Sequence, residues 1–321
     1  DKNKAVEYYT HAKAYYKLGL LFLDNDKEKS EEYFQLAIKN SDSNGYIGLG
    51  KLYRDINLDK SIEYFTLASK MNNPKAFKYL GDTFMSRDIN KSIEYYKQGS
   101  MKSSVNQKLS VADKSNKSSI KCQLALGNLY YNQNQIDLAK KYYEIASSHN
   151  NKESQFKLGL MYFNGIGVPK NTQKAQDYFE QSNTSDSLYY LGLIYLNIHK
   201  LPNQAKNYLL SSSKNKNEKA ALKLGNIYVQ EKNYQKAFEM FSSVGNNECA
   251  LLNLALMYSL GLGVTQNYQK AFELFSKLSA LGNSNGDLGL GHVFFFGNGK
   301  EVNYQKAHEF YSLSASKNNE D

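Results

Sequence analysis

Residues 158–179 read LGLMYFNGIGVPKNTQKAQDYF. The opening Leu-Gly pair and Tyr162 fall on one side of a helix, because residues three or four positions apart share a helical face. The small residue lets a neighbouring helix approach closely, and the aromatic side chain fills the space one turn further on. Beyond the glycine-rich segment, Ala175 is followed by large apolar residues three and four positions later, which is the apolar stripe of another helix. The stretch therefore predicts a helix, a turn and a second helix.

The same pattern recurs along the whole chain. Its small residues are spaced by 31, 31, 46, 32, 33, 33, 30 and 36 positions. The pairs are Leu18-Gly19, Leu49-Gly50, Leu80-Gly81, Leu126-Gly127, Leu158-Gly159, Leu191-Gly192, Leu224-Gly225, Leu254-Ala255 and Leu290-Gly291. An aromatic residue stands three positions after each small residue, from Phe22 in the first period to Phe294 in the last. Regular repetition at this period indicates a repeat array.

Each period predicts a helix A, a turn, a helix B and a second turn. Neither helix is long enough to be stable alone in water, so neighbouring repeats must bury each other's apolar stripes. The scarcity of proline, 3 residues in 321, agrees with a chain that is helical almost throughout. We therefore expect an all-α fold, a right-handed α/α superhelical solenoid of about nine helix-turn-helix repeats.

The turns between helices A and B carry a family resemblance. Three periods have long turns around Gly165-Ile166-Gly167, Gly261-Leu262-Gly263 and Gly297-Asn298-Gly299, each followed by Lys-Ala in helix B. With the Leu-Gly pair and the aromatic residue, this signature resembles the Sel1-like repeat. The other six periods place the second small residue 11 to 13 positions after the first, a spacing similar to that of tetratricopeptide repeats.

The pattern predicts a single solenoid over residues 1–321. Residues 1–12 resemble helix B of a truncated first repeat, and the chain begins with Asp1 rather than Met, so we expect a processed or excised piece of a longer protein. About 15 extra residues interrupt the period at about 100–119. They form either an exposed loop or prolonged helices, and act either as a tolerated surface insertion or as a joint or docking loop.

Composition restricts the function. The formal charge is +9, yet the lysines are scattered and form no block, so we expect no nucleic-acid partner. Cys122 and Cys249 are far apart and outside any CxxC pair, and the five histidines are dispersed. We therefore expect no disulfide framework, no metal and no cofactor. No apolar run approaches the ~18 residues that would cross a bilayer.

Two motif matches to catalytic or nucleotide sites have simpler explanations. Residues 282–286 spell GxSxG, but they connect helix B to helix A, whereas a nucleophile elbow joins a strand to a helix. Residues 45–51 approach a phosphate-binding loop, but Leu52 stands where a magnesium-binding hydroxyl belongs and no strand precedes it. The sequence therefore predicts that the protein is not an enzyme.

The resemblance implies where a partner would bind. In tetratricopeptide arrays, helix A lines a concave groove, and the positions three before, one after and four after its small residue face that groove. Carried over by spacing, they include Tyr16, Lys51, Arg54, Lys78, Asp82, Asn128, Tyr131, Phe163, Tyr189, Asn226 and His292. Asn128 and Asn226 are three repeats apart, which departs from the carboxylate clamp of chaperone-binding relatives.

We expect a scaffold or adaptor that binds partner proteins or peptides in this groove. The resemblance implies a bacterial envelope or secreted protein, or an adaptor in the endoplasmic reticulum or in cell-wall synthesis. The localisation stays open between the periplasm or exterior of bacteria and the cytoplasm or endoplasmic-reticulum lumen of eukaryotes. The alternatives are a cell-wall or small-ligand-binding module or enzyme related to peptidoglycan-linked repeat proteins, and an anionic-surface binder. Self-association through the apolar ends of the array also stays open.

Overall fold

A computed structural model describes residues 2–101 and 114–318, with side chains described for residues 4–101 and 117–317. The described residues form nineteen α-helices and no strand. The chain divides into two compact units, Asp1–Ala175 and Gln176–Asp321, and the division falls within one helix. Each unit is described by itself.

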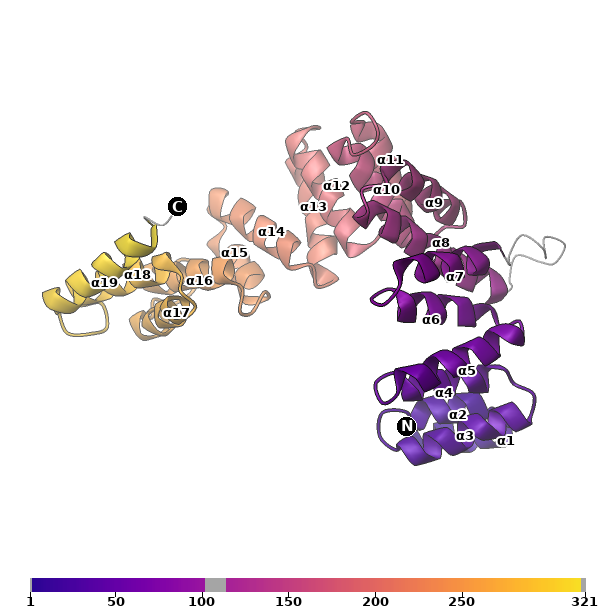
Figure 1. Ribbon diagram of the computed structural model, residues 1–321. Helices are drawn as coiled ribbons and strands as arrows, with labels where there is room; N and C mark the ends of the chain where they lie inside the picture. The colour runs from indigo at the N-terminus through magenta and orange to yellow at the C-terminus, as the bar shows by residue number, and fades with distance from the viewer. Residues whose placement is uncertain (1, 102–113, 319–321) are drawn as a thin grey trace. The chain divides into compact units, whose positions relative to one another are not determined.

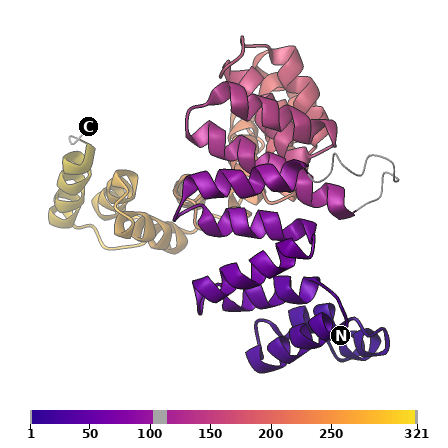
Figure 2. The ribbon, with the colours of Figure 1, turned by 45° about the vertical axis from the view of Figure 1, so that its right-hand side comes forward.

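Unit 1 begins with a single helix and continues with antiparallel helix pairs that follow one another along the chain (Figures 1 and 2). Its helices are α1 (Lys2–His11), α2 (Tyr15–Phe22), α3 (Lys27–Lys39), α4 (Asn44–Tyr53), α5 (Leu58–Lys70), α6 (Pro74–Phe84), α7 (Ile89–Met101), α8 (Lys114–Asn132), α9 (Ile136–Ser148) and α10 (Lys152–Asn164). α11 (Thr172–Ser182) crosses the division between the units.

Unit 2 continues with the same alternation of helices A and B (Figure 1). Its helices are α12 (Ser185–Asn197), α13 (Pro202–Lys214), α14 (Glu218–Gln230), α15 (Tyr234–Ser242), α16 (Glu248–Leu260), α17 (Tyr268–Ala280), α18 (Ser284–Phe296) and α19 (Tyr304–Asn318). From α2 to α19 the helices form nine A and B pairs, so the predicted all-α repeat fold is confirmed.

The small residue that recurs on each helix A is explained by its close contact with helix B. A Cβ atom added at Gly50 would lie 2.4 Å from the ring of Phe65, which is fully buried. The same clash would arise in the next pair, where an added Cβ at Gly81 would lie 2.4 Å from the Tyr96 ring. The ring of helix B therefore occupies the space that a side chain on helix A would need, which is the dense packing of a protein interior.

Each repeat has a second small residue, on helix B. In the first three pairs it is a serine, and Ser30, Ser61 and Ser92 donate hydrogen bonds of 2.8, 2.6 and 2.7 Å to the carbonyl oxygens of Gly19, Gly50 and Gly81. In the other six pairs it is an alanine that is at most 1% exposed. In the first three pairs these hydrogen bonds join helix B to helix A, and in the other six the alanine is buried.

The start of helix B explains the Lys-Ala part of the pattern. In α17, the side chain of Asn267 accepts a hydrogen bond from the backbone N–H of Lys270, which caps the helix. The ammonium group of Lys270 lies 5.1 Å from the centre of the Tyr258 ring on α16. Equivalent lysines lie over the aromatic ring of helix A in six other pairs. The lysine thus fixes the turn through its backbone and its side chain.

The three long turns depend on glycine. Gly165, Gly261 and Gly297 end their helices in the left-handed conformation with φ of 75°, 69° and 72°. Other residues adopt this conformation at a cost, whereas glycine has no Cβ atom to clash. The backbone conformation at these three helix ends therefore accounts for the glycines.

Part of the predicted insertion lies in a helix. Residues 114–119 form the first turns of α8, which has 19 residues and is the longest of the described helices. Residues 102–113 lie outside the described residues. At least this end of the insertion is therefore a prolonged helix A.

Candidate functional site

Among the described residues, three hollows lie along the helix-A faces, and a further one is lined by Ser185, Asp186, Lys216 and their neighbours. The Tyr16 hollow is lined by Tyr16, Leu20, Asn44, Asn73, Lys75 and their neighbours, and has a volume of about 570 Å³. The Asp82 hollow is lined by Lys78, Asp82, Tyr96, Lys121, Leu124, Asn128, Glu153 and their neighbours, and has a volume of about 630 Å³. The Phe275 hollow, in unit 2, has a volume of about 360 Å³. Five predicted groove residues line these hollows: Tyr16, Lys78, Asp82, Asn128 and His292.

The Tyr16 hollow lies where α2 meets the starts of α4 and α6. The Lys75 ammonium group lies 5.3 Å from the centre of the Tyr16 ring and donates a hydrogen bond of 3.1 Å to Asn44 Oδ1. Asn73 Nδ2 donates to Ser43 Oγ at 3.0 Å. Burial raises the pKa of Tyr16 to about 12. At neutral pH the phenol is therefore protonated, and the hollow combines the cations Lys17 and Lys75 with the carboxylate of Asp42 and neutral polar groups.

The Asp82 hollow lies between α6 and α8 and contains both signs of charge. Lys78 Nζ lies 2.6 Å from one carboxylate oxygen of Asp82, and the hydroxyl of Tyr96 donates to the other at 2.7 Å. Burial raises the pKa of Tyr96, and the hydrogen bond to Asp82 raises it further. The hydroxyl of Tyr143 donates to Asn128 Oδ1 at 2.8 Å. Asp82 and Asn128 are thus held in place by tyrosines of helices B.

Lys51 and Arg54 come together over one ring. The Lys51 ammonium group lies 5.1 Å, and the Arg54 guanidinium carbon 5.5 Å, from the centre of the Tyr79 ring on the next helix A. The two predicted groove cations therefore share an aromatic platform on α6, the helix that also carries Lys78. This arrangement leaves their charges at the surface of unit 1.

The remaining predicted residues have separate surroundings. Tyr131 is 37% exposed and Asn226 is exposed, whereas Phe163 is half-buried. Tyr189 is also half-buried and packs against the buried cluster of Leu209 and Leu224. These four residues lie outside the three hollows.

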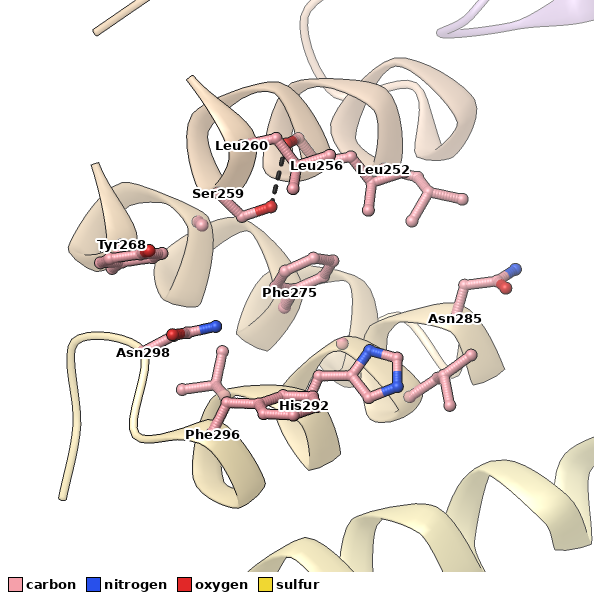
Figure 3. Close-up of a pocket in the computed structure, with 14 residues that line it drawn as sticks. Leu252, Leu256, Ser259, Leu260, Tyr268, Phe275, Asn285, His292, Phe296 and Asn298 are labelled. Atoms are coloured by element: carbon pink, nitrogen blue, oxygen red, sulfur yellow. Dashed lines mark hydrogen bonds between the residues drawn. The ribbon is translucent and has the colours of Figure 1, made fainter. Parts of the chain in front are cut away.

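Two apolar helical stripes face each other across the Phe275 hollow (Figure 3). α16 contributes Leu252, Leu256 and Leu260, and α18 contributes Leu288, His292 and Phe296. Phe275 of α17, which is 5% exposed, lies between them. The His292 ring contacts Phe296 and Tyr311, with ring centres 6.1 and 5.6 Å apart. The hollow is therefore apolar at its floor and along both sides.

Sequence reasoning missed most residues of the Phe275 hollow. Leu256 occupies the position directly after the small residue, as Asp82 and Asn128 do, but an apolar residue there looks like part of the core. The structure leaves Leu256 43%, Leu260 63% and Phe296 62% exposed. Leu256 is one position after Ala255 and Leu288 is three before Gly291, so the spacing would have identified these two if apolar residues had been considered there. Leu260 and Phe296 lie five positions after the small residue and fall outside the predicted pattern.

Among the described residues, no three His, Cys, Asp or Glu side chains gather as metal ligands. Within the same residues, no helix is both long enough and apolar enough to cross a membrane. Ser284 of the GxSxG match begins α18, and residues 45–51 of the other match lie inside α4.

Known structures resemble the chain over most of its length. The crystal structure of c5321, a protective antigen present in uropathogenic Escherichia coli strains with an SLR fold, has a TM-score of 0.56 and 21% identity, and the match covers 99% of this chain and 83% of that one. A Sel1 repeat protein from Oxalobacter formigenes has a TM-score of 0.57 and 21% identity, over 60% of this chain and 85% of that one. At this identity the likeness concerns the fold. No curated protein sequence matches the chain.

The Sel1 repeat family model matches eight segments of the sequence. They are residues 11–42, 45–73, 75–104, 120–151, 152–183, 218–243, 250–283 and 286–319. The pair formed by α12 and α13 lies between two matched segments and has the same helix-turn-helix form. Because the matched segments make up more than half of the sequence and the helix pairs have the expected form, the chain belongs to the Sel1 repeat family.

Proposed function

We propose that this protein is an interaction scaffold that binds partner proteins or peptides along its helix-A faces. One observation carries the proposal. Helices B use their small residues and rings to hold the repeats together, whereas all three hollows are lined mainly by helices A and by the segments next to them. Side chains there are therefore available to a partner.

The chemistry of the faces suits peptides. Lys51 and Arg54 place charge beside the Tyr79 ring, and Asn128 presents an amide. Aromatic rings, amides and cations match the apolar side chains, backbone groups and acidic groups of an extended peptide. The proposal involves binding alone and assigns no residue a role in a chemical step. A protein-binding role is also consistent with the family.

The first test is a pull-down from the source organism's lysate with the wild-type chain and a variant carrying Lys51→Ala, Arg54→Ala and Lys78→Ala. A matched control carries Lys27→Ala, Lys39→Ala and Lys70→Ala, three exposed lysines of helices B in the same unit. Proteins that bind are identified by mass spectrometry, purified and measured again by direct titration.

We expect at least one purified partner to bind the wild type and the control equally and the groove variant more weakly. Equal weakening by both variants would indicate attraction to net charge, as in an anionic-surface binder. Absence of any specific protein would contradict the proposal and favour the small-ligand alternative.

A further inference from the structure

We infer that the Phe275 hollow is the anchor site for an uncharged, bulky apolar side chain of a partner peptide. This inference rests on the proposed function and names the partner chemistry for unit 2. It follows from the shape, the charge and the polar ends of the hollow.

The shape of the hollow fits one or two large side chains. Its two walls are the stripes of α16 and α18, and its floor is Phe275 and Gly289. A volume of about 360 Å³ is at the lower end of the range for ligand sites in proteins. Leu256 and Leu288, on opposite walls, are 43% and 40% exposed. An apolar side chain inserted between them would remove their exposed surface from water, which is favourable.

The charge of the lining excludes an ionic anchor. Lys, Arg, Asp and Glu do not occur among the residues that line the hollow. The single carboxylate of α18, Asp287, is fully buried on another face of the helix, where it pairs with Lys317 Nζ at 2.6 Å. A charged group entering the hollow would lose hydration without gaining an ion pair with Lys, Arg, Asp or Glu, and this is costly. The matching anchor is therefore neutral.

The ends of the hollow are polar. Asn285 lies at one end, and Asn298 and Tyr268 lie at the other (Figure 3). Each asparagine amide can both donate and accept a hydrogen bond, as the backbone of a peptide can on either side of an anchor residue. A hydrocarbon chain would make no hydrogen bond with these amides, and the lining offers no Lys or Arg for an anionic lipid head group. A peptide segment satisfies both the apolar floor and the amide ends.

The test is selection of random short peptides displayed on phage against the full chain. Enriched peptides are synthesised with a fluorophore, and their Kd values are measured by anisotropy. The variants are Leu256→Glu and Leu288→Glu, which place a carboxylate at the rim. The control is Leu313→Glu on α19, a residue that is 42% exposed and lies outside the hollow. Circular dichroism shows whether each variant keeps its helices.

We expect the enriched peptides to share a neutral bulky apolar residue. Each rim variant should raise their Kd by at least about tenfold, while Leu313→Glu leaves it unchanged. Changing the shared residue to Asp should have the same effect as the rim variants. Peptides that ignore the rim variants but bind the Lys51, Arg54 and Lys78 triple variant weakly would overturn the inference and leave the proposed function standing. Absence of any enriched peptide would overturn the inference, while the lysate pull-down tests the proposed function separately.

Other occupants would also overturn the inference. If sedimentation shows that the wild-type chain is a dimer and that Leu256→Glu is a monomer, the hollow is filled by a second copy. If native mass spectrometry finds a lipid on the purified wild type that Leu256→Glu lacks, the occupant is a lipid.

Discussion

The Asp82 hollow and the Phe275 hollow occupy equivalent places in the repeat but differ in chemistry. Each lies between the A helices of two successive pairs, α6 and α8 in unit 1 and α16 and α18 in unit 2. The first is lined by Lys78, Asp82, Lys121 and Glu153, whereas residues of these charged types are absent from the lining of the second. The repeat geometry is therefore compatible with opposite kinds of binding surface.

The difference between the hollows correlates with the hydroxyl group of one buried ring of helix B. The ring of helix B that packs on helix A is a tyrosine in α7 and α9, and its hydroxyl binds the polar residue that follows the glycine, Asp82 or Asn128. In α17 the corresponding ring is Phe275, and Leu256 follows the small residue. A phenylalanine in helix B does not require an apolar residue after the glycine. Gly50 packs on Phe65, yet the residue that follows it is Lys51, whose ammonium group lies over the Tyr79 ring. A tyrosine in helix B thus marks a polar groove position.

The largest loss of stability is expected from disrupting the contact between the helix-A glycine and the helix-B ring, which occurs in both units. Leu in place of Gly127 or Gly225 would add atoms where a Cβ alone would lie 2.5 Å from the Tyr143 ring or 2.7 Å from the Phe241 ring. We expect each change to lower the free energy of unfolding by about 3 kcal/mol, measured by urea unfolding with circular dichroism. Asn226→Leu, at the exposed neighbouring position, should change it by less than about 0.5 kcal/mol. Equal effects of Gly225→Leu and Asn226→Leu would contradict the packing explanation.

The next prediction compares two carboxylates of helices A, Asp82 in unit 1 and Asp287 in unit 2. Asp82 of α6 faces a hollow, whereas Asp287 of α18 is fully buried and bound by Ser279 Oγ at 2.5 Å and Lys317 Nζ at 2.6 Å. Lys317→Ala would leave a buried charge without its cation, so we expect a loss of about 2 to 3 kcal/mol in urea unfolding. Adding Asp287→Asn should restore part of that loss, since a neutral amide costs less to bury. A double variant no more stable than Lys317→Ala would indicate that the charge is not the cause.

The fold could be predicted because its determinants are local and repeat nine times. The distance between Gly50 and Ser61, or between Gly19 and Ser30, is set by one helical hairpin, and the same sterics apply in every pair. The sequence therefore identified both helices of each pair, including α12 and α13, which lie outside the segments that the family model matches.

The hollows could be predicted only in part because exposure depends on neighbouring repeats. Polar positions such as Lys78 and Asn128 were identified by spacing, and the structure brings them into one hollow. Tyr189 has the same spacing, yet the helices that follow it half-bury its ring. Leu260 and Phe296 looked like core residues because their hydrophobicity says nothing about the space in front of them.

Alkaline pH should destabilise unit 1 more than unit 2. Burial raises the pKa of Cys122 in unit 1 from 9.0 to about 12, and it also raises the pKa of Tyr96 and Tyr143 above 10.0. The unfolded chain therefore loses these protons first as the pH rises, so the stability that is present below about pH 9 is lost between about pH 9 and 12.

We expect urea unfolding to show that unit 1 loses about 2 kcal/mol by pH 11. Cys122→Ala should remove the part of the loss that begins near pH 9, whereas the same substitution at the exposed Cys249 should not change the pH dependence. A decline that Cys122→Ala leaves unaltered would exclude this thiol as its source.

The smallest expected effect comes from the ring hydroxyl that Tyr96 has and Phe275 lacks. Tyr96→Phe removes the hydroxyl that donates to Asp82, so we expect a loss of about 1 kcal/mol in urea unfolding. The reverse change, Phe275→Tyr, adds a hydroxyl to the hollow and should also cost about 1 kcal/mol or more, because Leu256, at the position of Asp82 and Asn128, cannot accept its hydrogen bond. Adding Leu256→Asn to Phe275→Tyr would recreate the pair that Asn128 and Tyr143 form in unit 1. Since these residues are neighbours, the double variant should be more stable than the sum of the single changes, and strict additivity would show that the ring hydroxyl does not determine the polarity of the groove.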